Sequence, residues 1–110
     1  MIGKSTRIDY DLLGQAVAGA VGSPSKGGTF QFTVSTTPTA LGALEVKMVT
    51  IKADRSNTDA VYIGFDSDLN SSNGFALDPG ESVDIVIDNL GKVYVVSQST
   101  AQKIYVMWVG

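Results

Sequence analysis

The sequence contains no cysteine and no histidine among its 110 residues. The lack of cysteine excludes disulfide bridges and thiolate chemistry and leaves the redox compartment undetermined. Without cysteine and histidine, the common zinc sites and imidazole general-base catalysis are excluded as well. Any catalysis would therefore have to use carboxylates, hydroxyls or lysines.

Basic residues are also scarce, with eight lysines and arginines against eleven acids and a net charge of −3. General nucleic-acid binding requires clustered basic side chains, so we expect no nucleic acid as a partner. No apolar run approaches the ~20 residues that span a bilayer, so we expect no membrane partner either. A signal peptide is not expected, because Asp9 and Asp11 interrupt the approach to a short, Gly- and Ala-rich apolar segment.

The residues that are abundant are those of a small β-protein. The length is near the mode for one independently folding domain. Hydrophobic residues make up 44% and charged residues 17%, which is a folding composition. Twelve glycines and many Val, Ile, Thr and Tyr residues favour strands over helices. A domain of this size buries only about two-thirds of its unfolded surface, so the core is expected to be modest.

Residues 1–28 have a different pattern, which we interpret as an N-terminal arm or short helix followed by a linker. Apolar residues recur at helical spacing in two adjacent rows: Ile8, Leu12, Ala16 and Ala20, and Leu13, Val17 and Val21. Glycines within the stretch each cost about 1 kcal/mol in a helix, so a free helix would be marginal. The stretch "GSPSKGG" at residues 22–28 is typical of a flexible linker. Residues 1–28 are either a helix on the domain's own core or an arm that orders against a neighbouring subunit or larger partner.

Residues 29–110 predict an all-β domain, a small antiparallel β-sandwich or jelly roll, because short alternating segments are separated by turns. The rows expected to face inward are Phe30, Phe32 and Val34; Val61, Ile63 and Phe65; and Val83, Ile85 and Ile87. The apolar alternation shifts by one residue between Met48 and Val49, which predicts a bulge or bend.

Acidic residues concentrate in one stretch that contains no base. They are Asp59, Asp66, Asp68, Asp78, Glu81, Asp84 and Asp88. Asp66, Asp68 and Asn70 match the start of a calcium loop, but Ser71 replaces the turn glycine and Leu77 replaces the closing glutamate. We therefore favour an Asx-rich surface loop and leave weak cation binding at Asp66 and Asp68 open.

A pair of catalytic carboxylates is the second hypothesis for the acids. Asp84 and Asp88 share a strand face, but at about 3.3 Å per residue their Cα atoms would lie roughly 13 Å apart. Glycoside hydrolysis uses carboxyl groups about 5–9.5 Å apart, and no nucleophile motif is present. We expect no enzyme activity, no catalytic residue, no cofactor and no metal, and we interpret the acids as a solvated face that discourages edge pairing.

Three tyrosines, Tyr62, Tyr94 and Tyr105, are out of phase with the inward rows. A face that carries them with Val96 and Met107 is too apolar to be left bare in water. It is the core of a second layer, a subunit interface or a sugar-stacking patch. The candidate partner interface comprises Ile8, Tyr10, Leu12, Leu13, Val17, Tyr62, Tyr94, Tyr105 and Met107.

The stretch "NGFALDPGESVD" at residues 73–84 predicts a corner between two strands. Pro79 presets φ for the turn, and Gly80 accepts the positive φ that a type II turn needs at its next position. Phe75 and Leu77 before the turn are expected to face inward, as are the apolar residues after it. Asp78 and Glu81 flank the turn at the solvated rim.

From residue 48 to residue 110, the chain resembles small structural proteins of tailed bacteriophages. The shared pattern comprises "VTIKA", "NTDAVYIG", "NGFALDPGESV", "NLGKVYV" and a short final strand. The order and spacing of these motifs are more specific than any one of them, and they contain no catalytic signature. The N-terminal arm lies outside the matched region.

This resemblance implies a β-sandwich or jelly roll on the virion, made in the bacterial host cytoplasm. The implied role is capsid decoration, or cement: a homo-oligomer, often a trimer, that binds the major capsid protein on the outer surface of the head and stabilises it. The alternative is a head-fibre, neck or tail-associated binding module that contacts the host surface or its glycans.

Overall fold

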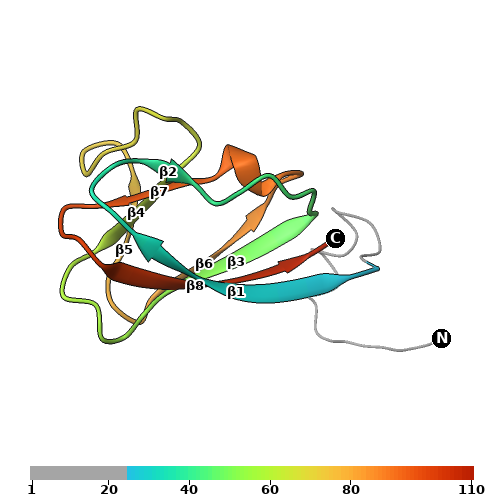
Figure 1. Ribbon diagram of the computed structural model, residues 1–110, viewed down its shortest axis with the longest axis horizontal. Helices are drawn as coiled ribbons and strands as arrows, with labels where there is room; N and C mark the ends of the chain where they lie inside the picture. The colour runs from blue at the N-terminus through green and yellow to red at the C-terminus, as the bar shows by residue number, and fades with distance from the viewer. Residues whose placement is uncertain (1–24) are drawn as a thin grey trace.

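The computed structural model describes residues 25–110, which form two antiparallel sheets and one short 3-10 helix (Figure 1). The strands and the helix η1 have the following bounds: β1 Gly27–Val34, β2 Thr39–Ala40, β3 Met48–Ala53, β4 Val61–Gly64, β5 Phe75–Leu77, β6 Ser82–Val86, η1 Leu90–Lys92, β7 Tyr94–Ser97 and β8 Gln102–Val109. Within these residues, no helix is long and apolar enough to cross a membrane.

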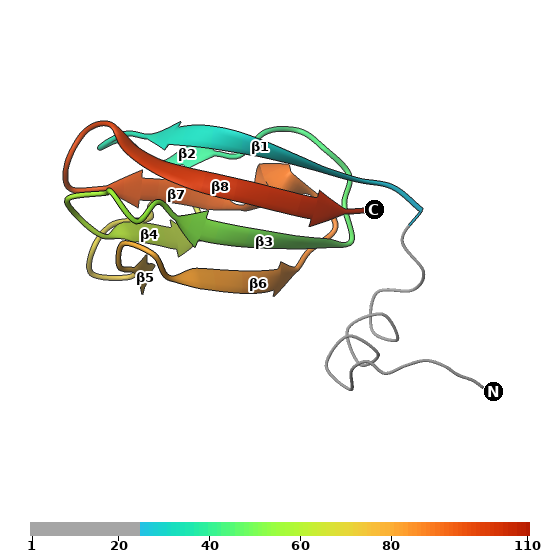
Figure 2. The same cartoon turned by 90° about the horizontal axis from the view of Figure 1, so that it is seen from below.

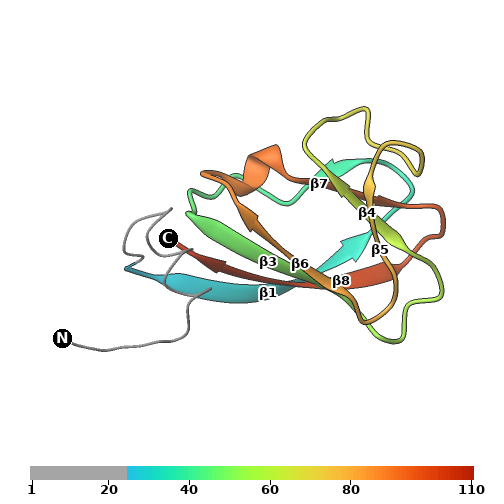
Figure 3. The same cartoon turned by 180° about the vertical axis from the view of Figure 1, so that it is seen from behind.

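The strand order is that of a jelly roll. One sheet has the order β1-β8-β3-β6 and the other β2-β7-β4-β5 (Figure 2). The chain pairs β1 with β8, β2 with β7, β3 with β6 and β4 with β5, as if one long hairpin were rolled up. The tip of this hairpin is the loop at residues 65–74, which lies at the opposite end of the sandwich from the C-terminus (Figure 3). The expected all-β sandwich is confirmed.

The core lies between the two sheets and is built from the inward rows of both. Its buried members are Val34, Leu41, Val46, Val49, Ile51, Ala53, Val61, Ile63, Leu77, Leu90, Val93, Val95, Ile104 and Val106. Phe30, Phe32, Val83, Ile85 and Ile87 pack against it while only partly buried. The predicted alternation of β1 and β6 is therefore confirmed.

Two phenylalanines predicted to face inward are exposed instead. Phe65 is 61% exposed because β4 ends at Gly64, and the residue after it no longer follows the strand alternation. Phe75 is 60% exposed although it stands opposite the buried Ile63. Its strand β5 has only three residues and forms the edge of its sheet, so too little structure lies beside Phe75 to cover it.

The phase shift near Met48 marks the start of β3. Val46 and Val49 are both buried although they are three positions apart, whereas regular strand alternation would bury residues two or four apart. Before Met48 the chain makes only an isolated bridge, between Glu45 and Asn89, and regular pairing begins at Met48. The shift is thus a bend at the strand's entrance.

The strand β1 begins inside the stretch that we expected to be a linker. Gly27 pairs with Val109, and Gly28 pairs with Trp108. A Cβ atom on Gly28 would lie 2.8 Å from Nε1 of the Trp108 indole, so glycine is needed for this close approach. The glycines here are strand residues and not spacer.

The turn at residues 78–81 has the predicted geometry and joins the two sheets. The N–H of Glu81 donates to the carbonyl of Asp78 at 2.9 Å, and Gly80 has φ of +90°. The Glu81 carboxylate also accepts from the N–H of Asp78 at 2.9 Å. Since β5 and β6 belong to different sheets, the turn is a corner of the sandwich.

Candidate interaction surface

The outer face of the β1-β8-β3-β6 sheet carries two exposed apolar side chains on its second strand. Inward Ile104 and Val106 alternate with outward Tyr105 and Met107, which are 40% and 54% exposed. The register places Met107 between Thr29 of β1 and Thr50 of β3. It places Tyr105 between Gln31 and Lys52 in the same way. These six residues form one contiguous surface, which we call the β8 face.

The β8 face contains a depression and continues into a second apolar row. The depression is lined by Thr29, Phe30, Gln31, Thr50, Lys52, Tyr105, Val106 and Met107. Beside it, Met48 of β3 stands between Val109 of β8 and Val86 of β6, and Val86 is 56% exposed. An apolar strip therefore crosses three strands next to the row that holds Thr29, Met107, Thr50 and Asp84.

Two hydrogen bonds fix the polar side chains around this surface. Thr50 Oγ1 donates to Asp84 Oδ1 at 2.6 Å, and the Tyr105 hydroxyl donates to Asp54 Oδ2 at 3.4 Å. The pKa of Asp54 is lowered, mainly because the backbone N–H of Ser56 donates to its carboxylate, with Tyr105 and Lys103 acting in the same direction. The lowered pKa favours the Asp54 anion, which accepts from the Tyr105 hydroxyl.

The structure separates the residues of the predicted partner interface. Tyr62 and Tyr94 lie on β4 and β7, so they point outward from the other sheet, on the opposite side of the sandwich from Tyr105 and Met107. The predicted interface residues of the N-terminal arm, namely Ile8, Tyr10, Leu12, Leu13 and Val17, lie outside the described residues. The structure therefore divides the described residues into two pairs: Tyr105 and Met107 on β8, and Tyr62 and Tyr94 as diagonal neighbours on the paired strands β4 and β7.

The outer face that carries Tyr62 is covered by the chain's own loop at residues 65–74. Leu69 of this loop is only 4% exposed, and its Cδ1 lies 2.6 Å from where a Cβ atom of Gly64 would stand. Beneath the same loop, Tyr62 is half-buried, and Val96 opposite it is 6% exposed. This part of the apolar surface is therefore an accessory packing layer.

Within the loop, the side-chain oxygens that resembled a calcium site accept backbone hydrogen bonds. Asp66 Oδ1 accepts from the N–H of Asp68 at 3.0 Å. Asn70 Oδ1 accepts from the N–H groups of Ser72 and Asn73 at 2.8 and 3.2 Å. These are the Asx turns predicted for a surface loop. In residues 25–110, no group of three or more acidic residues is placed to hold a metal ion.

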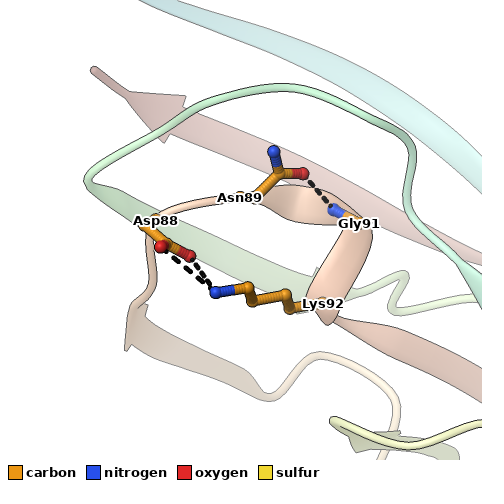
Figure 4. A network of polar contacts seen from close by, with 4 residues as sticks. All are labelled: Asp88, Asn89, Gly91 and Lys92. Atoms are coloured by element: carbon orange, nitrogen blue, oxygen red, sulfur yellow. Dashed lines mark hydrogen bonds and ion pairs between the residues drawn. The ribbon is translucent and has the colours of Figure 1, made fainter.

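Asp84 and Asp88, the pair weighed as catalytic carboxylates, have different partners. Asp84 accepts from Thr50, whereas Asp88 lies beyond the end of β6 and forms an ion pair with Lys92 at 2.9 Å (Figure 4). The hydrogen bond and charge of Lys92 lower the pKa of Asp88. Beside it, Asn89 Oδ1 caps η1 by accepting from the N–H of Gly91 at 2.8 Å.

The neighbours of Tyr105 and Met107 on the β8 face were not predicted. Thr29, Gln31 and Thr50 are out of phase with the inward rows of their own strands, and that phase was readable in the sequence. Their proximity was not, because β1 and β3 flank β8 only through pairings between distant segments.

No protein-family model matches the sequence, and no curated protein matches it. Among solved structures, IMPa from Pseudomonas aeruginosa, in a complex with an O-glycopeptide, matches with a TM-score of 0.50 and 16% identity. The match covers 79% of this chain and 12% of that one. A second structure of IMPa, described as a metallopeptidase, matches with a TM-score of 0.48.

Two further structures match with TM-scores of 0.45. One is a protein of Bacillus endospore appendages, described as disulfide-linked pili, at 15% identity over 81% of this chain and 92% of that one. The other is YomS, derived from the SPBc2 prophage, at 19% identity over 78% of this chain and 96% of that one. Similarity at this level carries no conclusion about function.

The likeness to IMPa corrects the expectation that the protein is not an enzyme. A domain of this fold occurs inside a metallopeptidase chain, of which it spans 12%. The β-sandwich and the lack of a catalytic motif therefore do not exclude membership in an enzyme, because a fold does not determine function. At 16% identity the likeness shows the fold alone, and it transfers no catalytic residue.

Proposed function

We propose that this protein is a structural component of a tailed-phage virion that decorates the outer surface of the capsid and stabilises it. The observation that carries the proposal is the β8 face, where exposed Met107 and Tyr105 stand among three uncharged polar side chains and one lysine. Support also comes from the motif resemblance at residues 48–110, whose central turn forms the corner between the two sheets.

The chemistry of the β8 face suits a protein surface as its partner. Methionine and tyrosine are enriched at the centres of protein interfaces, while lysine and acids are depleted there. The β8 face has one lysine, Lys52, at its border with Ser82 of β6. Each decoration contact can be weak, because a homo-oligomer that binds a repetitive shell gains avidity.

The test uses phage heads assembled from a genome that lacks this gene. Purified protein is added to the heads, and its occupancy and the temperature at which the heads release DNA are measured. We expect saturable binding to the major capsid protein and a higher release temperature. Binding without gain in heat resistance, or no binding, would contradict the decoration role.

A matched pair of variants tests the surface. Met107→Glu places a charge in the β8 face, and we expect it to lower the affinity for heads at least tenfold. Phe65→Glu is the control, because Phe65 is as exposed but lies beyond β4 in the other sheet. If both variants lose the same amount of affinity for heads, the β8 face is not the surface that contacts the capsid.

Copy number separates decoration from the alternative role. A head-decoration protein is present in hundreds of copies per virion, whereas a head-fibre, neck or tail component is present in a few to tens. Quantitative mass spectrometry of purified virions measures this directly.

A further inference from the structure

The strand β1 is exposed as a sheet edge along its whole length. It pairs with β8 residue by residue, from Gly27 opposite Val109 to Val34 opposite Gln102, with no bulge. Within residues 25–110, no strand pairs with its other side. In Figure 2, β1 and β6 form the two outer edges of the sheet. An unbroken edge of eight residues is a template for another strand.

The other three sheet edges are protected in ways that β1 is not. Natural sheets discourage edge pairing with short strands, charges, prolines or bulges. The edge strands β2 and β5 have two and three residues, and β6 has five with Asp84 at its centre. The sequence of β1, "GGTFQFTV", contains no charge and no proline.

The inward row of β1 is incompletely covered. Phe30 and Phe32 pack against the core but remain partly exposed. Because β1 is an edge strand, both rings have a neighbouring strand, β8, along one flank of β1 and no strand along the other in the described part of the chain. A strand added along β1 would bury the open sides of both rings, which is the main apolar gain available at this edge.

We propose that β1 pairs with β1 of a second copy of this chain, antiparallel, about a two-fold axis at Gln31. In this register Phe30 stands opposite Phe32 of the second copy, and the same pair recurs across the axis. Thr29 stands opposite Thr33 of the second copy on the outer face. Aromatic pairs and Thr–Thr pairs are among the favourable cross-strand pairs. The uncharged strand brings no like charges together.

The neighbouring registers fit less well. An axis at Phe30 places Phe32 opposite Gly28 and leaves one aromatic pair, Phe30 with Phe30 of the second copy, in place of two. An axis at Phe32 places Thr29 opposite Ser35, and the carbonyl of Ser35 already accepts from the N–H of Ser97 at 2.9 Å. The axis at Gln31 keeps the paired residues 28–34 inside β1.

The contact is isologous and joins the β1-β8-β3-β6 sheets of two copies into one continuous eight-stranded sheet. It does not depend on the proposed decoration role, because it uses only the edge of β1. It gives even numbers of subunits: a dimer by itself, or a pair of trimers if a separate three-fold contact exists.

Light scattering on the full-length chain tests the subunit number. We expect an even-numbered oligomer that Gln31→Lys dissociates, with the dissociation constant rising at least tenfold, because two lysines meet at the axis. Ser82→Lys is the matched control, since Ser82 is an exposed residue on β6, the opposite edge of the same sheet. The control is expected to keep the subunit number of the original chain.

Cysteine trapping provides a second measurement, independent of the lysine variant's folding. The chain has no cysteine, so Gln31→Cys supplies its one thiol. Opposed Cα atoms in an antiparallel pair are about 4.5–5.5 Å apart, within disulfide range. Mild oxidation is expected to give a covalent dimer from Gln31→Cys and little from Ser82→Cys.

Three outcomes would overturn the proposal. The first is a monomer at all concentrations, as expected if the N-terminal arm or a different protein occupies the edge. The second is an oligomer whose mass Gln31→Lys leaves unchanged while that variant remains folded. The third is cross-linking of Gln31→Cys no faster than that of Ser82→Cys.

Discussion

Gln102 and Thr58 are joined by two hydrogen bonds through one buried side chain. Gln102 Oε1 accepts from the backbone N–H of Thr58 at 2.8 Å, and Gln102 Nε2 donates to Thr58 Oγ1 at 3.2 Å. The same Oε1 accepts from the N–H of Asp59 at 3.0 Å, and Nε2 also donates to the carbonyl of Thr100 at 3.0 Å. Gln102, 5% exposed, thus fixes the loop before β4 to the start of β8.

We expect Gln102→Leu to destabilise the fold by about 1–3 kcal/mol, because the partly buried N–H groups of Thr58 and Asp59 lose their acceptor. Urea unfolding followed by fluorescence of Trp108 measures the change. Gln98→Leu is the control, since Gln98 is exposed and makes one side-chain hydrogen bond, to Ser71 at 3.2 Å. Its effect is expected within about 0.5 kcal/mol. A similar loss in both variants would refute this role of the buried amide.

Ala101→Gly is expected to stabilise the protein. Ala101 has φ of 63° in the turn between β7 and β8, a conformation that costs an L-residue about 1–2 kcal/mol. Glycine removes this strain but adds unfolded-state entropy, so we expect a net gain of about 0.5–1 kcal/mol. Ala60→Gly, at a position without positive φ, is expected to destabilise. If urea unfolding shows that both variants change the unfolding free energy in the same direction, the strain at Ala101 is not the cause.

Local patterns in the sequence predict most of the strands. The alternation of Phe30, Phe32 and Val34 assigns the inward face of β1 correctly because one sheet face is buried. Likewise, Pro79 and Gly80 predict the corner between the sheets because their backbone preferences are local. Alternation fails at Phe65, where the strand ends one residue earlier and the side chain becomes exposed.

The surface could be predicted less well, because it depends on which strands become neighbours. Tyr62 and Tyr105 are both out of phase with the inward apolar row of their own strand, but they lie on opposite outer faces of the sandwich. Alternation distinguishes the side chains of one strand that face the core from those that face outward. It does not show to which of the two sheets the strand belongs. Nor did it indicate that Leu69, in a polar loop, would cover the face of Tyr62. Both features follow from the jelly-roll winding.

Acidification is expected to destabilise the fold partly through Asp54. The pKa of Asp54 is lower in the folded chain than its ordinary value of 3.8, so the unfolded chain binds more protons in this range. Asp54 therefore contributes to the stability of the fold above pH 3.8, and this contribution is lost as the pH falls through the pKa of the folded chain. We expect Asp54→Asn to flatten the dependence of the unfolding free energy on pH below about 5. Urea titrations at several pH values measure this slope, and parallel slopes for the two proteins would exclude the contribution.

Deleting residues 1–24 is expected to leave a folded domain. The buried core extends from Val34 to Val106, and the described chain is closed by a contact at Ser25 and Lys26. The carbonyl of Gly110 accepts from the N–H groups of Ser25 and Lys26 at 2.6 and 2.9 Å. We expect the unfolding free energy to change by less than about 1 kcal/mol, because no described core residue is removed.

Deleting residues 1–28 is the matched comparison, because it also removes Gly27 and Gly28 from β1 and exposes the indole of Trp108. We expect this longer deletion to destabilise the domain by about 1–3 kcal/mol, through lost strand pairing and lost packing. Urea unfolding of both truncated chains distinguishes the two interpretations of the N-terminal segment. If the shorter deletion already costs several kcal/mol, residues 1–24 pack as a helix on the domain's own core. If only the longer one does, they are an arm whose contacts lie on another subunit or partner.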